Sequence, residues 1–529
     1  MAERPWWRGA VIYQIYPRSF ADSNGDGVGD LAGITSKLAY VAALGVDAIW
    51  LSPVFTSPMR DFGYDVADYR GIDPLFGTLA DFDALLAAAH GLGLRVIIDQ
   101  VYSHTSSDHA WFTASRAARV GPHADYYVWA DPRPDGTPPN NWQSMFGGGA
   151  WSWEPRRRQY YLHNFLPSQP DLNFHNPLLQ QEILDIARFW LERGVDGFRL
   201  DVANFYAHDA ALRDNPALAN ADAVKPYDMQ SHVYDRSRPE TLRFLARLRA
   251  VLDAYPDRMA VAELATSQPV ARMAEYTAGP DRLHTAYSFA FLAGALTPAR
   301  VARVVGGLRA RAPAAWPSWA FENHDVPRSL TRWGQGRPSV FARSLIALLT
   351  TLRGTAFLYQ GQELGLTQAE LPFEALRDPD GIAFWPAYKG RDGCRTPMPW
   401  TGAQHGGFST GAPWLPVAAA HLALNAAAQA EDAGSLLCWT RRFLAWRRTQ
   451  AVLLAGEIRF LALPDPLLGF TRELDGLALT LVFNLGEQAA ALPLSAAPEA
   501  AFDLGATWHD GALALPAGTA VVSRGTPLN

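Results

Sequence analysis

Strand-like and helix-like segments alternate along this chain, and this alternation constrains its fold more than any other feature. Eight short apolar segments each lead into a polar loop, at residues 11–16, 48–51, 95–99, 197–201, 259–263, 285–289, 318–322 and 355–359. Helical patterns separate most of them, for example at residues 34–44, 79–92, 180–193 and 239–254. Strands that alternate with helices predict a parallel sheet, and eight such units predict an α/β fold closed as a (β/α)8 TIM barrel.

Two long spans and one change of pattern divide the chain further. Residues 105–169 are rich in Trp, Tyr, Pro and Gly and are too long for a simple loop, so they predict a small domain inserted after the third strand. Residues 206–238 form a long polar loop of the kind that often serves as a lid or a binding loop. We expect the barrel over 1–104 and 170–451, the inserted domain over 105–169, and an antiparallel β-sandwich-like domain over 452–529.

Charge and cysteine content limit the partners of the protein. The net charge is −6 and no Lys/Arg run is present, which argues against a nucleic-acid partner. The first eight residues lack the apolar segment of a signal peptide, and no apolar stretch is long enough to span a membrane. Cys394 and Cys438 favour two free thiols in a reducing compartment, with one disulfide as the alternative. We expect a cytoplasmic monomer or homodimer.

Three acidic residues, Asp201, Glu263 and Asp325, end or closely follow predicted strands. Because a barrel places its active site at the carboxyl ends of its strands, these carboxylates should converge. Arg199 precedes Asp201 by two residues and points to the same face, where its charge would lower the pKa of Asp201, as suits a nucleophile. A structural ion pair is the alternative. Glu263 follows an apolar strand that would raise its pKa, as suits a general acid.

The histidines do not predict a catalytic metal. His104 lies near Asp99, and His324 precedes Asp325, but neither histidine belongs to an HxH or HExxH pattern. We also expect no organic cofactor.

One loop does predict a structural cation. Oxygen ligands alternate with glycines that allow a tight path, at Asp22, Asn24, Asp26, Val28 and Asp30. Gly33 stands where an EF-hand loop carries its bidentate Glu, and the flanking helices of an EF-hand are missing. We therefore expect a structural calcium loop, with magnesium or an ion-free turn as alternatives.

Taken in order, these segments resemble the α-amylase family of glycoside hydrolases, in its α-glucosidase and oligo-1,6-glucosidase branch. The matching stretches are DFGYD at 61–65, DQVYSH at 99–104, QPDLN at 169–173, GFRLD at 197–201, VAE at 261–263, NHD at 323–325, GTAFLYQG at 354–361 and RTPM at 395–398. The resemblance runs from about residue 8 to residue 450.

The resemblance implies a retaining exo-α-glucosidase that releases terminal α-linked glucose from short oligosaccharides or α-glucosides, with some transglucosylation. Asp201 would be the nucleophile, Glu263 the acid/base and Asp325 the stabiliser of the transition state. A retaining pair places its carboxyl groups roughly 5–5.5 Å apart. The residues expected to bind the terminal glucose are Asp61, Tyr64, His104, Phe165, Gln169, Arg199, His324 and Arg395.

The substrate remains open at the leaving side of the bond. Val202 follows Asp201, and in this branch a valine there accompanies α-1,6 cleavage, although one residue does not decide the linkage. One alternative is a sucrose- or trehalose-converting relative of the same family. The other is a non-catalytic sugar-binding barrel, which the presence of all three acids disfavours.

Overall fold

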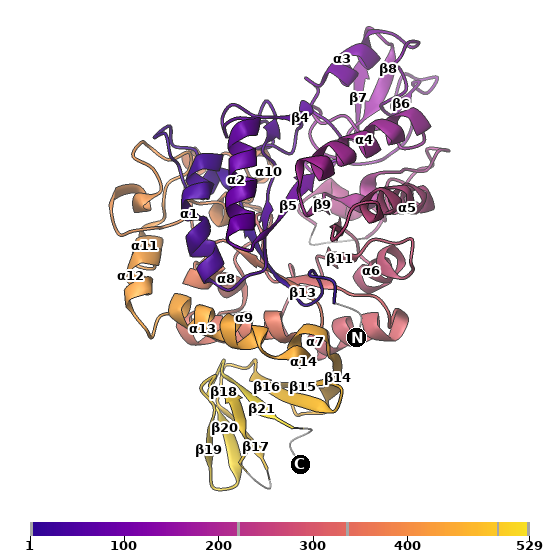
Figure 1. The fold of residues 1–529 in the computed structure, drawn as a ribbon. Helices are drawn as coiled ribbons and strands as arrows, with labels where there is room; N and C mark the ends of the chain where they lie inside the picture. The colour runs from indigo at the N-terminus through magenta and orange to yellow at the C-terminus, as the bar shows by residue number, and fades with distance from the viewer. Residues whose placement is uncertain (1–3, 220–222, 335–337, 495–496, 526–529) are drawn as a thin grey trace.

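A parallel eight-stranded sheet forms the centre of the molecule, with helices around it (Figure 1). The computed structural model describes residues 4–219, 223–334, 338–494 and 497–525. The central strands are β1 (Val11–Ile15), β2 (Ala48–Leu51), β5 (Arg95–Gln100), β9 (Gly197–Leu200), β10 (Met259–Leu264), β11 (Thr285–Ser288), β12 (Ser318–Ala320) and β13 (Thr355–Tyr359).

The strand order β11-β10-β9-β5-β2-β1-β13-β12 is that of a barrel opened at one seam. At that seam the hydroxyls of Thr285 on β11 and Ser318 on β12 lie 2.8 Å apart, so the two end strands meet. All residues of β1, β2, β9, β10 and β13 are buried, as expected of strands covered on both faces. The predicted (β/α)8 barrel is confirmed.

The helices of the chain follow the strands in the expected rhythm. They are α1 (Leu31–Ala43), α2 (Leu79–Gly91), α3 (Ala110–Ala117), α4 (Pro177–Arg193), α5 (Pro239–Asp253), α6 (Pro269–Thr277), α7 (Pro298–Arg311), α8 (Ser329–Trp333), α9 (Pro338–Thr351), α10 (Pro379–Phe384), α11 (Ala419–Leu422), α12 (Ala426–Glu431), α13 (Leu436–Arg448) and α14 (Ala451–Ala455). Helix α1 begins at Leu31, three residues before the predicted start, because the Asp30 carboxylate accepts a hydrogen bond from the Gly33 amide and caps the helix.

A small antiparallel sheet lies within the span predicted to be inserted. Its strands are β6 (Trp129–Ala130), β7 (Trp151–Glu154) and β8 (Gln159–Leu162), in the order β6-β8-β7. Helix α3 packs on this sheet, with Phe112 stacked on Trp129 at 5.8 Å between ring centroids. The short strands β3 (Phe55–Thr56) and β4 (Asp68–Ile72) pair separately. In Figure 1 the inserted sheet extends from one end of the barrel.

The chain ends in an antiparallel β domain, as predicted. One sheet has the order β14-β15-β16-β21-β18, and a smaller one has the order β17-β20-β19. Their bounds are β14 (Glu457–Leu461), β15 (Leu467–Leu474), β16 (Leu477–Asn484), β17 (Ala490–Pro493), β18 (Ala500–Phe502), β19 (Thr507–His509), β20 (Ala512–Leu515) and β21 (Ala520–Arg524). The domain lies beside α9 and α14, at the end of the barrel opposite the inserted sheet (Figure 1).

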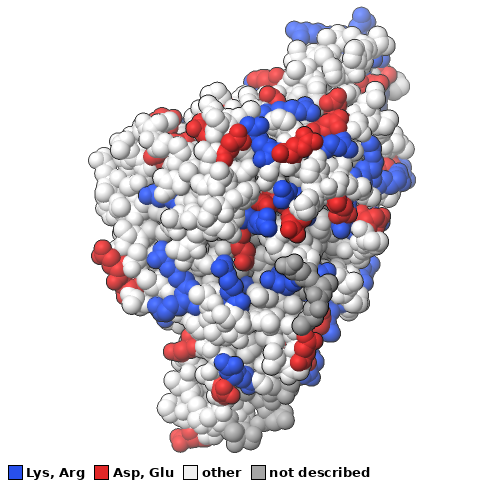
Figure 2. Space-filling model, viewed as in Figure 1, with Lys and Arg blue, Asp and Glu red and all other residues white. Residues whose placement is uncertain are grey.

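One face of the molecule carries mixed charge (Figure 2), and the long loop at 206–238 packs on the inserted domain. On the face drawn in Figure 2, acidic and basic side chains are interspersed. Within its described residues, the loop at 206–238 has little regular structure beyond one 3-10 turn at Pro226–Met229. It packs on the inserted domain, where the Trp142 indole donates a hydrogen bond to the Arg213 carbonyl at 2.9 Å. No helix in the described part of the chain is both long and apolar enough to cross a lipid bilayer.

Candidate active site

A cavity of about 230 Å³ opens at the carboxyl ends of the central strands. It brings together seven of the predicted site residues, Asp61, Tyr64, His104, Phe165, Asp201, Glu263 and Asp325. The other predicted residues lie behind this lining and contact it: Gln169, Arg199, His324 and Arg395. Val202 also lines the cavity, and residues that the sequence did not predict complete the lining, namely Met145, Phe146, Lys225, Ala265, Phe289, Asp380, Tyr388 and Arg391.

Arg199 joins the two residues predicted to act on the bond. Its side chain is fully buried on β9, and the register of the sheet places Asp99 on β5 beside it. One terminal nitrogen donates to Asp99 at 2.8 Å and also to Asp201, while the other lies 2.6 Å from Glu263. A single guanidinium therefore bridges the carboxylates of Asp201 and Glu263.

Burial governs the protonation of these acids. It raises the pKa of Glu263 to about 7, as predicted for a general acid. It also raises the pKa of Asp201 to about 7, and the charge of Arg199 only partly opposes this. The prediction that Arg199 holds the pKa of Asp201 low is therefore wrong, because burial outweighs the charge of Arg199 and the negative charges of Asp99 and Asp325 add to the effect of burial. The charge of Asp201 also raises the pKa of Glu263, after burial, which is the larger cause.

Two further hydrogen bonds orient Glu263. The Tyr287 hydroxyl donates to its Oε1 at 2.9 Å, and the Val202 amide donates to its Oε2 at 3.2 Å. Tyr287 is directly beside Glu263 in the register of β10 and β11. Val202 has φ 33°, a left-handed conformation that is rare for a β-branched residue and typical of functional sites. This turn aims the Val202 amide at the carboxylate.

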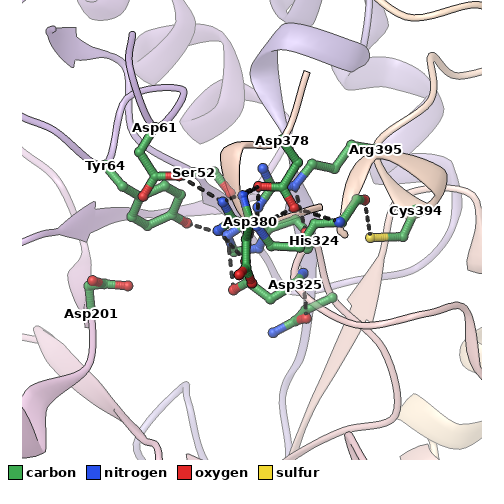
Figure 3. A network of polar contacts seen from close by, with 12 residues as sticks. Ser52, Asp61, Tyr64, Asp201, His324, Asp325, Asp378, Asp380, Cys394 and Arg395 are labelled. Atoms are coloured by element: carbon green, nitrogen blue, oxygen red, sulfur yellow. Dashed lines mark hydrogen bonds and ion pairs between the residues drawn. The ribbon is translucent and has the colours of Figure 1, made fainter. Parts of the chain in front are cut away.

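Asp325 lies among cations. Its Oδ1 accepts from Arg395 at 3.0 Å and is 3.4 Å from Arg391. Burial opposes ionisation of Asp325, but these neighbours outweigh it and hold the pKa of Asp325 well below its ordinary value. Figure 3 shows Asp325 close to His324 within this polar network, with Asp201 drawn apart from it. Asp325 is thus ionised at neutral pH.

His324 is held in one tautomer. The Gln14 amide nitrogen can only donate, and it lies 2.8 Å from Nδ1 of His324, which must therefore accept. Burial lowers the pKa of His324 well below its ordinary value, so the ring is neutral and carries its proton on Nε2. That nitrogen lies 2.6 Å from the Tyr64 hydroxyl, which in turn donates to Asp99 at 3.1 Å. The ring N–H thus donates to the Tyr64 hydroxyl and fixes the orientation of Tyr64, which lines the cavity.

Asp61 is held from two sides at the back of the pocket. Gln169 donates to its Oδ2 at 3.0 Å, and Arg391 donates to its Oδ1 at 2.8 Å. Gln169 also lies 3.2 Å from Nε2 of His104. Burial lowers the pKa of His104 to about 4, so His104 is neutral. These residues give this side of the pocket a surface of hydrogen-bonding groups.

Aromatic rings near the carboxyl ends of the strands can stack on sugar rings, and three were candidates by their position in the sequence: Tyr64, Tyr102 and Phe165. Tyr64 and Phe165 line the cavity. Tyr102 does not, because its side chain is fully buried in the core and packs against Tyr69 and Tyr206, at 6.1 and 6.5 Å between ring centroids.

Arg391 is the main functional residue that sequence reasoning missed. It contacts Asp61, Asp325 at 3.4 Å and Asp378 at 2.7 Å. Asp378 is buried and receives three donor contacts from the Arg391 side chain, which fixes the guanidinium. Arg391 precedes Arg395 of the matched RTPM stretch by four residues, so the neighbourhood of that motif could have indicated it.

Sequence reasoning also missed the loop residues at the opening of the cavity. We call Met145, Phe146, Lys225, Asp380 and Tyr388 the rim, and Asp201, Glu263 and Asp325 the strand-end wall. The rim residues come from three loops that are far apart in the chain and carry no shared motif. The one available signal was composition, since only three of the 46 basic residues are lysines.

Hydrogen bonds within the loop curl the segment that was predicted to hold a cation. The Asp22 carboxylate accepts from the amides of Gly25 at 2.7 Å and Gly27 at 2.9 Å, and the Asn24 side chain donates to Asp26 at 3.1 Å. The side chains of Asn24 and Asp26 remain exposed, and that of Asp22 is half-buried.

Asp30 fits the predicted cation loop less directly. Its carboxylate is engaged by Gly33 of α1 and by Ser23. Among the residues that the structure describes, no three His, Cys, Asp or Glu side chains are grouped to hold a metal.

Comparisons with known proteins agree with this geometry. The model of the α-amylase catalytic domain matches residues 14–456. A probable α-glucosidase of Rhizobium meliloti is 56% identical over 499 residues, which covers 92% of this chain and 91% of that protein. An oligo-1,6-glucosidase of Heyndrickxia coagulans is 39% identical over 525 residues, covering 91% and 92%. The crystal structure of an α-glucosyl transfer enzyme superposes with TM-score 0.96 at 55% identity, covering 99% of this chain and all of the other.

Proposed function

The chain belongs to the α-amylase family of glycoside hydrolases, and from this premise we propose that it is a retaining exo-α-glucosidase. Its substrates are short oligosaccharides and α-glucosides with a terminal α-linked glucose. The observation that carries the proposal is the bridge by which Arg199 holds Asp201 and Glu263 together. An inverting pair stands roughly 6.5–9.5 Å apart to admit a water between the acids, whereas a retaining pair is closer.

The first step uses one ionised and one protonated carboxyl group. The Asp201 carboxylate attacks C1 of the terminal glucose, and the bond from C1 to the leaving oxygen breaks. Glu263 gives its proton to that oxygen, which its pKa of about 7 allows near neutral pH. The products are a β-glucosyl ester on Asp201 and the free leaving sugar or alcohol.

The second step reverses these roles. Glu263, now ionised, takes a proton from water while the water oxygen attacks C1 and frees Asp201. A sugar or alcohol hydroxyl can replace the water, which transfers the glucose instead. Transglucosylation is part of the proposal, and the likeness to an α-glucosyl transfer enzyme supports it.

Asp325 serves the transition state in both steps. Arg391 and Arg395 keep it ionised close to the sugar, so its charge can stabilise the positive charge that develops at C1. Asp61 adds an acceptor for the sugar's hydroxyls, and the neutral His324 orients Tyr64 beside it. These groups are held before substrate binds, so little reorganisation is needed during the reaction.

Trapping of the intermediate tests this proposal. Incubation with 5-fluoro-α-glucosyl fluoride should leave a fluoroglucosyl group on the peptide that contains Asp201, detected by mass spectrometry. In normal turnover, α-glucose should appear first in NMR spectra of the products. Initial release of β-glucose, or labelling of another acid, would contradict the proposed roles. Asp201→Asn should abolish both labelling and turnover while the protein stays folded.

We also propose a calcium ion, with magnesium as the alternative, in the loop of Asp22, Asn24, Asp26, Val28 and Asp30. It would neutralise the carboxylates of the curled loop and have no part in the chemistry. Its removal by a chelator should lower the melting temperature by a few degrees, and calcium should restore it. An unchanged melting temperature would argue against the ion.

The setting of the enzyme completes the proposal. We propose a cytoplasmic monomer or homodimer that acts on small molecules, and both free cysteines are consistent with a reducing compartment. Light scattering of the purified protein measures the oligomeric state.

A further inference from the structure

Three loops that are distant in the sequence meet at one lysine on the rim. The Lys225 ammonium forms an ion pair with Asp380, which follows β13 in the chain. It also lies 3.5 Å from the Met145 carbonyl of the inserted domain. Its position 4.4 Å from the centroid of the Tyr388 ring adds a cation–π contact. Lys225 therefore connects the loop after β9, the inserted domain and the loop after β13.

The inserted domain and the loop after β13 also touch each other directly. A Cβ atom added to Gly147 would lie 2.8 Å from the Phe384 ring, so the ring packs on the glycine backbone. Beside it, the Arg391 guanidinium lies 5.1 Å from the centroid of Phe146. These contacts close one side of the rim without help from the loop after β9. Lys225 supplies the contact that holds the loop after β9 against the other two loops.

The pair of Lys225 and Asp380 is sheltered and faces the cavity. Their side chains are 17% and 5% exposed, and both residues line the pocket. Asp380 Oδ1 has no hydrogen-bond partner in the described structure, although the atom is buried. A buried carboxylate oxygen without a donor is costly, so Asp380 depends on the charge of Lys225 for its stability. Any change that separates this pair should therefore be resisted.

The other two lysines show how unusual this placement is. Lys37 packs over the ring of Trp400 outside the cavity lining. Lys389 pairs with Glu370 on the loop after β13, and those two side chains are 57% and 72% exposed. An ammonium directs three donors from one compact charge, whereas a guanidinium is a wide planar fork. A lysine therefore suits a site where one group must serve several loops at once.

We infer that Lys225 limits the leaving group, and equally the acceptor, to about one sugar ring. This inference rests on the proposed function, since it concerns the side of the bond away from the terminal glucose. The donor glucose is placed by the strand-end wall, and the ring beyond it faces Lys225 and Asp380. A third ring would have to pass between the rim loops, and so would have to separate Lys225 from Asp380 or from Met145. Disaccharides and small glucosides are thus the preferred substrate class.

A chain-length series tests the role of Lys225. Values of kcat/KM are measured for glucose oligomers of two to five rings, in the linkage that the wild type cleaves. For the wild type we expect a fall of about tenfold from two rings to three. For Lys225→Ala we expect a fall of less than about threefold, because the rim can open. Lys225→Arg, which keeps the charge, should retain most of the wild-type selectivity.

Two controls separate selectivity from damage. Lys389→Ala removes the other lysine–carboxylate pair of the same loop and should match the wild type. Alpha-glucosyl fluoride has no leaving sugar, so its turnover should stay within about threefold of wild type in every variant. Melting temperatures check that each variant is folded.

Each result decides the inference. An equally steep fall with chain length in Lys225→Ala, or a flat series in the wild type, overturns it. Equal losses on the fluoride and on the disaccharide also overturn it, because they show damage to the catalytic residues. A wild type that cleaves no α-glucoside contradicts the proposed function itself, which keeps the two failures distinct.

Discussion

The strand-end wall and the rim bound the same cavity but are built in different ways. In the wall, Glu263 receives contacts from Arg199, Tyr287 and Val202. Arg199 and Glu263 are almost completely buried, at 0% and 2% side-chain exposure. In the rim, Lys225 remains 17% exposed and joins its loops mainly through one ion pair. The wall is therefore rigid and over-determined, whereas the rim depends on few contacts.

This difference assigns the two regions different tasks. Groups that act on the breaking bond must be in place before the substrate arrives, which the hydrogen-bonded wall achieves. Groups that select substrates need only make the binding of unsuitable substrates unfavourable, and a few loop contacts suffice for that. We therefore expect substitutions in the wall to reduce the turnover of every substrate. Substitutions in the rim should instead change which substrates have the highest kcat/KM.

Glu263→Gln should have the largest effect. On p-nitrophenyl α-glucoside we expect kcat to fall by about 10²–10⁴-fold, the usual contribution of a general acid–base group. Fluoride needs no proton to leave, so stopped-flow assays with α-glucosyl fluoride should still show a rapid burst, followed by slow turnover. Glu374→Gln, at an exposed position, is the matched control. Loss of the burst would show that Glu263 does more than move protons.

Arg391→Lys tests where the wall ends. Arg391 lines the cavity beside the rim but binds Asp61 and Asp325. A lysine cannot reproduce these paired contacts, and a lost charged hydrogen bond corresponds to about a 10–100-fold change. We expect kcat/KM to fall by that factor for all chain lengths alike, with exposed Arg377→Lys unchanged. A loss confined to longer substrates would place Arg391 in the rim.

The pH dependence should separate the two regions next. Burial raises the pKa of both Asp201 and Glu263 to about 7. Asp201 must lose its proton and Glu263 must keep its own, so kcat/KM should form a bell near neutral pH. Each limb should fall by about tenfold per pH unit.

Two variants sharpen the reading of that profile. Glu263→Gln should lose the alkaline limb, because its amide has no proton to lose. Lys225→Ala should keep both limbs in place, since no contact joins Lys225 to either acid in the described structure. A shift of either limb in Lys225→Ala would show that the rim also tunes the wall.

The wall could be predicted from the sequence because its residues lie on strands. Arg199 and Asp201 are two residues apart on one strand, and this spacing alone places both side chains on the same face. The pKa of Asp201 could not be predicted in the same way. It depends on Asp99, a hundred residues earlier, which competes for the same guanidinium. The direction of a side chain on a strand thus follows from the local sequence, whereas its pKa depends on groups that only the fold brings near.

The rim escaped prediction for a related reason. Residues 206–238 have neither a strand nor a helix period, and Lys225 meets Asp380 across 155 positions and Met145 across 80. No short sequence motif indicates that residues so far apart in the chain are in contact. The rarity of lysine could have drawn attention to Lys225, but only the fold shows what Lys225 contacts.

Val202 belongs to both regions, and its substitution should have the smallest effect. Its amide holds Glu263, while its side chain packs with Phe165 and Phe205 beside the cavity. Val202→Thr keeps the branched shape at φ 33° and replaces one methyl group with a hydroxyl. Turnover of α-glucosyl fluoride should therefore change little. The ratio of kcat/KM for isomaltose and maltose should shift by about three- to tenfold, because only the path of the leaving sugar changes.

The control and the contrary result locate the boundary between the regions. Val233→Thr makes the same replacement at an exposed loop position, 44% exposed, and should leave the ratio unchanged. A large loss on the fluoride in Val202→Thr would mean that the strained turn itself was disturbed and that Val202 acts through its amide. A changed ratio with intact fluoride turnover means that its side chain acts on the leaving sugar. In that case the backbone amide of Val202 supports the catalytic Glu263, and the side chain of Val202 contributes to substrate selection.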